Sequence, residues 1–216
     1  MRRATLVLAL ITLAGILTGC GDTEGVLDDE DASRLVEQVL ADLELPGEPE
    51  LAANIPEIPE GELEFGFHCH IQSAGFEIDD ALVAFPPARV GHHEIAGGPI
   101  ERVEVALLVF DTAATASAVL AAYDAPETID CLSRTFSEAI QLETDDPLEA
   151  GEVTAEGFAF TIGEGGIQRE GHRTFAAVVG RTLVDVTVLA PDESRGREMA
   201  EEVLGDIVNA LEAGGA

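Results

Sequence analysis

The chain has 216 residues, with 42 Asp and Glu against 11 basic residues, and its formal net charge at pH 7 is −31. This charge excludes a nucleic-acid binder, and it excludes attachment to anionic lipid through basic side chains, because both need clustered Arg and Lys. The apolar content of 46% is too high for a disordered chain, so one domain with a substantial core is expected.

The first residues have the pattern of a secretory signal. Two Arg follow Met1, and the uncharged run 4–18 is rich in Leu, Ile and Val. A membrane-spanning helix needs about 20 apolar residues, so this run is too short to be one. A basic start followed by a short apolar run is instead typical of a signal that is removed on export.

The sequence Leu17-Thr18-Gly19-Cys20 resembles the lipobox of bacterial lipoproteins. The resemblance implies that residues 1–19 are a signal peptide and that the thiol of Cys20, the new first residue, carries a diacylglyceryl group. Two or more acyl chains, such as palmitate, anchor a protein stably, so a cell-membrane location on the extracytoplasmic side is expected. The alternatives are an ordinary cleavage site with an incidental Cys, and an uncleaved anchor.

Two cysteines remain if Cys20 carries lipid, and an exported protein favours pairing them. One disulfide between Cys69 and Cys131 is therefore expected, and the alternative is two buried thiols. A nucleophilic Cys69 served by its neighbours His68 and His70 is disfavoured, because neighbours on a strand point to the opposite face.

Residues 20–62 are acidic and punctuated by prolines, which predicts a tether between anchor and domain. Within it, Asp31 to Leu43 places its apolar residues on one side of a helix. Two interpretations remain open for this stretch: a short helix that docks on the domain, or a charged disordered spacer throughout.

Residues 63–216 are predicted to form one α+β domain, a mainly antiparallel sheet with helices packed on one face. Apolar alternation predicts strands over 63–72, 76–85, 100–110, 153–162, 174–179 and 182–189, the last two joined as a hairpin at Gly180-Arg181. Apolar stripes with capping residues or Pro at their starts predict helices over 112–123, 126–142 and 191–213. Loops are expected over 144–151 and 163–171.

His68 and His70 stand at i and i+2 on the first predicted strand, a spacing that lets two imidazoles share a metal ion. They are weak candidate ligands, to which His92, His93 or His172 could add from loops, and the alternative is a pair of solvated side chains. No P-loop, nucleophile-elbow or zinc-protease motif occurs in the sequence, so neither a cofactor nor catalysis is expected. The many carboxylates predict a protein that tolerates or prefers salt.

The segment Val103–Ala116, with sequence VEVALLVFDTAATA, is similar to a strand, corner and Ala-rich helix in actinobacterial exported domains. Together with Cys131-Leu132, the late hairpin and the last helix, it resembles the extracellular sensor domain of PknH-type serine/threonine kinases and lipoproteins that carry this domain alone. The resemblance covers residues 63–213 and implies an extracytoplasmic sensing or ligand-binding role. The family usually has two disulfides, Trp is absent here, and no functional residue carries over.

These features together predict a membrane-anchored, non-catalytic module that binds a small ligand or an envelope protein of unknown identity. Two other interpretations remain. One is a structural envelope protein that presents its acidic surface to a partner. The other is a metal protein or enzyme that uses the histidines.

Overall fold

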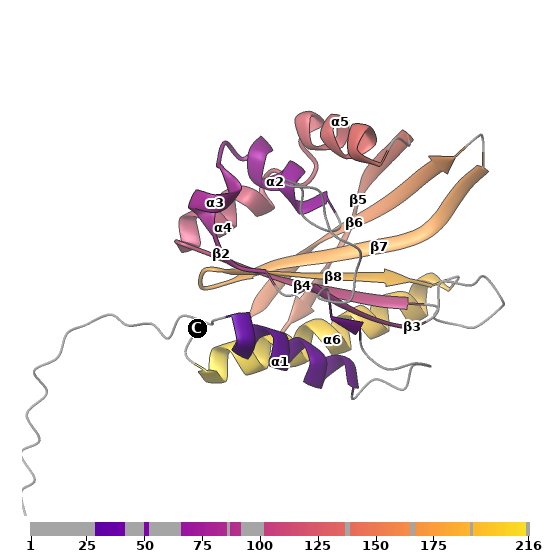
Figure 1. The fold of residues 1–216 in the computed structure, drawn as a ribbon. Helices are drawn as coiled ribbons and strands as arrows, with labels where there is room; N and C mark the ends of the chain where they lie inside the picture. Colours follow the sequence, from indigo (N-terminus) through magenta and orange to yellow (C-terminus); the bar gives the residue numbers. More distant parts are fainter. Residues whose placement is uncertain are drawn as a thin grey trace, which may run out of the picture.

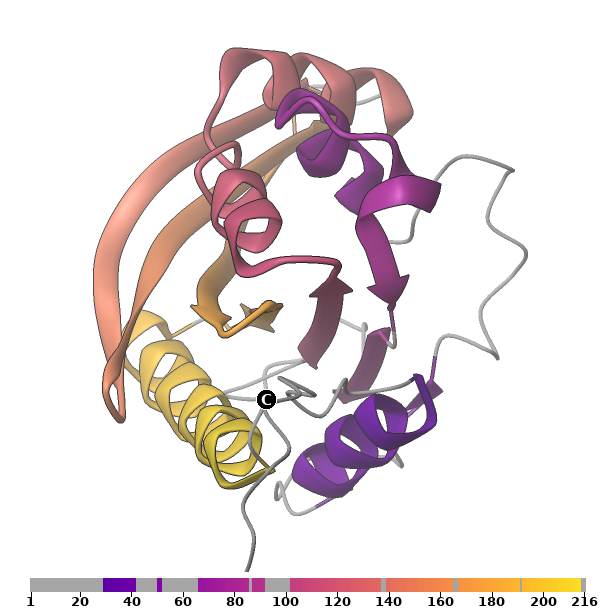
Figure 2. The same ribbon diagram turned by 90° about the vertical axis from the view of Figure 1, so that its left-hand side faces the viewer.

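The apolar run Arg102–Phe110 forms strand β4, in which every residue from Val103 onward is buried. A strand buried along its whole length needs cover on both faces of the sheet. Val103, Val105 and Leu107 contact one apolar core, whereas Ala106, Leu108 and Phe110 contact another. Helices accordingly lie on both sides of the sheet (Figures 1 and 2), and the prediction that they pack on one face is wrong.

The computed structural model describes residues 29–41, 50–51, 66–85, 87–91, 102–136, 139–164, 167–190 and 192–214. Its strands form one eight-stranded sheet in the order β1-β3-β4-β8-β7-β6-β5, with β2 paired to β4 beside β3, and every pairing is antiparallel. Besides β4, the strands are β1 (Glu50–Leu51), β2 (Leu82–Ala84), β3 (Pro87–Gly91), β5 (Ala139–Ala150), β6 (Val153–Glu164), β7 (Ile167–Val179) and β8 (Thr182–Leu189).

Six helices accompany the sheet in the described residues. They are α1 (Asp29–Ala41), α2 (Phe67–Ser73), α3 (Ile78–Ala81), α4 (Ala113–Leu120), α5 (Pro126–Thr135) and α6 (Glu193–Gly214). Helices α1 and α6 cover one face, and α2 to α5 lie on the opposite side (Figure 1). The expected class, a single α+β domain with an antiparallel sheet, is confirmed. None of these helices is long and apolar enough to cross a membrane.

Helix α1 is part of the folded domain. Its apolar side chains are buried against α6 and the sheet, where they join the larger core: Ala32, Val36, Val39 and Leu40. Strand β1 extends the same unit, because Glu50 pairs with Arg89 of β3. Of the two interpretations of this stretch, the structure shows the helix that docks on the domain. Residues that the sequence pattern assigned to the tether are therefore part of the domain.

Residues 67–73 form a helix where a strand was expected. Phe67 and Ile71, one helical turn apart, enter the core beside β4, while Cys69 faces α5. Alternating and helical spacing coincide over so short a segment, and tertiary packing decides between them. Gly66 begins the helix with a φ of 77°, and a Cβ at this position would collide with the side chain of Leu132.

Pairing between consecutive strands also overrides two other predictions. Helix α5 ends at Thr135, so the predicted helix over 126–142 is too long, and β5 occupies part of it together with the expected loop at 144–151. Strand β7 likewise takes up most of the expected loop at 163–171. The hairpin between β7 and β8 is confirmed, with Gly180 at a φ of 57° in its turn.

Candidate functional site

A row of polar side chains crosses the sheet beneath α2 and α4. Glu104 of β4 lies opposite Thr187 of β8, and Thr187 lies opposite Thr174 of β7. Asp185 precedes Thr187 by two residues and therefore points to the same face. Leu183 and Ala176 on this face belong to the core under the helices, so the row interrupts an otherwise apolar surface.

Asp185 is the centre of a buried hydrogen-bond network. The hydroxyl of Tyr123, which lies just after α4, donates to Asp185 Oδ2 at 2.8 Å. Thr187 donates to Asp185 Oδ1 at 3.3 Å, and the hydroxyl oxygens of Thr187 and Thr174 are 2.6 Å apart. Tyr123 and Asp185 are 1% and 5% exposed, so the polar atoms of each must form their hydrogen bonds within the protein.

His70 of α2 lies against the ring of Tyr123, with 4.2 Å between the ring centroids. His70 is only 3% exposed, and neither of its nitrogens forms a hydrogen bond of good geometry within the described residues, apart from a weak contact with the Gly66 backbone that raises the pKa of the ring. A buried polar group without a partner is unfavourable by about 1–3 kcal/mol. Much of the hydrogen-bonding capacity of the His70 ring is therefore unused inside the domain.

Arg102 and Glu104 add an ion pair at the end of the row. Arg102 Nη2 and Glu104 Oε1 are 2.8 Å apart, and the side chains are 17% and 11% exposed. We call His70, Tyr123, Asp185, Thr187 and Thr174, together with this ion pair, the polar cluster.

Burial sets the protonation of the polar cluster. It raises the pKa of Asp185 to about 7; the bonds from Tyr123 and Thr187 oppose this shift, and the charge of Glu104 adds to it. Burial lowers the pKa of His70 to about 4, with a smaller opposing contribution from the Gly66 backbone. Burial, with the charge of Asp185, also raises the pKa of Tyr123 well above its ordinary value. Near neutral pH, the cluster therefore exchanges its proton at Asp185.

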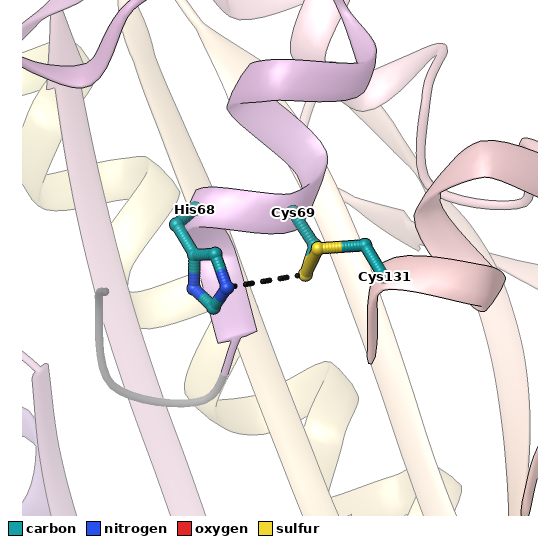
Figure 3. A group of neighbouring side chains, drawn as sticks. All are labelled: His68, Cys69 and Cys131. Atoms are coloured by element: carbon teal, nitrogen blue, oxygen red, sulfur yellow. Dashed lines mark hydrogen bonds between the residues drawn. A yellow bond between two sulfur atoms is a disulfide. The ribbon is translucent and has the colours of Figure 1, made fainter. Parts of the chain in front are cut away.

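A second group of side chains surrounds a disulfide. Cys69 of α2 is bonded to Cys131 of α5, and the two Cα atoms are 5.6 Å apart. Figure 3 shows His68 pointing at this bond. The distance from His68 Nε2 to Cys69 Sγ is 3.3 Å. The same nitrogen is 3.2 Å from Thr135 Oγ1. His68, Cys69 and Cys131 are the group among the described residues whose ligand atoms lie close enough together to hold a metal ion.

The helix separates the two histidines that the sequence placed on one strand face. Residues i and i+2 of a helix are about 200° apart around its axis, so His68 faces the disulfide and His70 faces Tyr123. The shared strand face on which these two weak candidate ligands depended is therefore absent, and the argument that His68 cannot reach Cys69 is wrong. Cys20, His92 and His93 lie outside the described residues, and His172 is at a β7 position paired with Phe160.

The sequence reasoning missed Tyr123 and Asp185. A signal for Asp185 was present, because it is the one acidic residue in the apolar run of β8. Tyr123 is the single Tyr of the chain and follows an Ala-rich helix. Their hydrogen bond spans 62 residues of sequence, however, and no local pattern indicates which residues such a bond joins.

No protein-family model and no curated protein matches the chain. Among solved structures, the crystal structure of the extracellular domain of PknH from Mycobacterium tuberculosis is weakly similar. The TM-score is 0.45 at 14% sequence identity, and the alignment covers 86% of this chain and 96% of that one. A similarity of this size does not assign the chain to a family, so its own residues must carry any proposal about function.

Proposed function

We propose that the chain is a lipid-anchored, extracytoplasmic module that binds a small polar ligand at the polar cluster without catalysing a reaction. The main support is His70, a buried imidazole whose nitrogens form no hydrogen bond of good geometry, beside the Tyr123–Asp185 bond. The lipobox-like Leu17–Cys20 supports the location, and it lies outside the described residues.

The position of the cluster supports recognition. Its members come from α2, from the segment after α4, and from three strands, so one ligand there would contact parts of the chain far apart in sequence. A buried polar group that lacks a hydrogen-bond partner destabilises the fold. A ligand that supplies the missing hydrogen bond recovers this free energy.

The chemistry of the cluster indicates the class of ligand. At neutral pH, the uncharged imidazole offers one acceptor and one donor nitrogen, and the Asp185 and Glu104 carboxylates accept further bonds. Two carboxylates and one Arg give the cluster a negative charge when Asp185 is ionised. A small amine or polyol fits this arrangement better than an anion does.

Each hydroxyl of the cluster already has a hydrogen-bond partner inside the cluster, which favours binding over catalysis. Tyr123 donates to Asp185, and Thr174 is bonded to Thr187. Asp185 is the base in contact with the Tyr123 hydroxyl, but burial raises the pKa of Tyr123 well above its ordinary value, so this hydroxyl stays protonated and is a poor nucleophile.

The anchor would hold the domain close to the membrane. Helix α1 begins at Asp29, so only a short segment separates it from Cys20. Even fully extended, that segment reaches at most about 30 Å. A ligand of this module would therefore be met near the membrane surface.

Tyrosine fluorescence tests the binding proposal directly. The chain has one Tyr and no Trp, so its intrinsic emission reports on Tyr123 inside the polar cluster. The full chain is titrated with small primary amines, quaternary amines, polyols and carboxylates. We expect an amine or polyol to change the emission saturably, and Asp185→Asn to weaken that binding about 10-fold or more, the effect of losing one charged hydrogen bond.

Glu104→Gln serves as a second variant, because it keeps the shape of the side chain and removes its charge. Saturable binding that neither variant weakens would place the ligand elsewhere. If no amine or polyol saturates the emission, the proposal is contradicted.

A further inference from the structure

We propose that Cys69, Cys131 and His68 form a Zn²⁺ site when the disulfide is reduced. The site is separate from the polar cluster, and the proposal does not depend on what binds there. It assigns the three side chains two exclusive states: a covalent link between α2 and α5 when oxidised, and a metal-mediated link when reduced.

The three ligand atoms are already gathered. They all lie within 4.8 Å of one another, and His68 Nε2 is 3.3 Å from Cys69 Sγ. Tetrahedral zinc, with bonds of about 2.3 Å to sulfur and about 2.0 Å to nitrogen, holds its ligand atoms about 3.5–3.8 Å apart. The Cα atoms of the two cysteines are 5.6 Å apart, so rotation of the side chains suffices to make room for the ion.

The charge of the site favours Zn²⁺ over a monovalent soft cation. Two thiolates and a neutral imidazole cancel the charge of Zn²⁺, whereas Cu⁺ would leave one negative charge. Cys69 is fully buried and His68 is 5% exposed, and an uncompensated charge is unfavourable there. A chain that already carries a net charge of −31 disfavours a further anion.

The surroundings provide an entry path and a fourth position. Cys131 is half-buried whereas Cys69 is fully buried, so the site is nearest to solvent at its α5 side. The hydroxyl of Thr135 lies 3.2 Å from His68 Nε2 and 3.7 Å from Cys69 Sγ. Zinc sites with three protein ligands complete their tetrahedron with water, and this hydroxyl is placed to hydrogen-bond a water in that position.

The chemistry balances with a dithiol as reductant. The dithiol gives two electrons and two protons to the Cys69–Cys131 bond, which becomes two thiols, while the dithiol becomes a disulfide. Binding of Zn²⁺ then displaces one proton from each thiol to solvent. A disulfide oxidant reverses the change: it takes two electrons from the Cys69 and Cys131 thiolates and two protons from solvent to become a dithiol, while the Cys69–Cys131 bond re-forms and Zn²⁺ is released.

The test uses the full chain purified without a polyhistidine tag and reduced with a water-soluble phosphine, which adds no competing thiol. Zn²⁺ affinity is measured by competition with a chromophoric chelator, and Co²⁺ is used as a spectroscopic substitute. We expect one ion per reduced chain, bound at least about 100-fold more tightly than by the oxidised chain, with thiolate-to-cobalt charge-transfer absorption. His68→Gln should weaken binding about 10-fold or more, as loss of a ligand does.

Two controls separate this site from the acidic surface. The oxidised chain has every carboxylate but no thiol, and the double variant Cys69→Ser with Cys131→Ser has every carboxylate under reducing conditions. The proposal is overturned if reduced wild-type chain binds Zn²⁺ no more tightly than either control, or if the cobalt complex lacks thiolate absorption. An unchanged affinity in folded His68→Gln overturns it too, and so does a reduced chain whose Tyr123 emission is that of unfolded protein and is not restored by Zn²⁺.

Discussion

Asp185 carries the proton that the polar cluster exchanges near neutral pH, and this links its ionisation to folding. In the unfolded chain its pKa is the ordinary 3.8, and in the folded chain it is about 7. Between these values the folded chain keeps a proton that the unfolded chain has lost. Raising the pH across this range therefore lowers the free energy of unfolding.

The ionisation of His70 changes the free energy of unfolding in the opposite direction. Its pKa falls from 6.5 to about 4 on folding, so between these values the unfolded chain is protonated and the folded chain is not. Raising the pH from about 4 to 6.5 therefore increases the free energy of unfolding. Over this range the contributions of Asp185 and His70 largely cancel, and only the Asp185 contribution remains between 6.5 and about 7.

Asp185→Asn separates the two contributions. Relative to wild type, we expect the variant's free energy of unfolding to rise with pH from about 4 to 7, by up to about 1.4 kcal/mol per pH unit. Urea unfolding at several pH values in this range measures the difference. Asp206→Asn, which removes an exposed carboxylate from α6, is the matched control. Parallel curves for wild type and Asp185→Asn would show that Asp185 ionises normally.

At the scale of whole elements, local signals predicted those parts of the fold where they agree with packing. Strand β4 and the hairpin at Gly180 follow from alternation and turn chemistry, and Thr112 caps α4 by accepting a bond from the Thr115 backbone. The strand predicted over 63–72 was wrong because Phe67 and Ile71 are four residues apart, a spacing that fits both the alternation of a strand and one turn of a helix. Strand β5 was missed because its pairing with β6 stabilises it more than its own sequence does.

The candidate site was predictable to a smaller extent. The bonded pair Cys69 and Cys131 was named by counting cysteines, which needs no geometry. The role of His68 depends on the helical state of α2, and the partnership of Tyr123 with Asp185 depends on contacts across the domain. Local sequence patterns do not predict which residues from distant segments come together in a site.

Helix α1 offers a test at the element scale. Leu40 is fully buried in the larger core, so Leu40→Ala should lower the free energy of unfolding of the domain by about 2–5 kcal/mol. Gln38→Ala, on the exposed side of the same helix, should change it by less than about 0.5 kcal/mol. Urea unfolding followed by Tyr123 emission gives both values. Equal stabilities for the two variants would mean that α1 is not part of the cooperative unit.

The charge of the whole molecule opposes its compact state. With 42 acidic and 11 basic residues, most carboxylates have no cation to pair with. Salt screens their repulsion over about 10 Å at 0.1 M and about 3 Å at 1 M. We therefore expect the thermal midpoint of unfolding to rise with NaCl between these concentrations, and to rise equally with KCl. A midpoint that stays constant, or falls, would contradict the idea that surface repulsion limits stability.

The mass of the first peptide shows whether this domain works at the outer surface of a membrane. The chain is isolated from membranes of a bacterium that makes it, digested and analysed by mass spectrometry. We expect a polypeptide that begins at Cys20 with a diacylglyceryl group on its sulfur, and release from the membrane after Cys20→Ala. A polypeptide that begins at Met1 and is found in the cytosol with Cys69 and Cys131 as free thiols would contradict it.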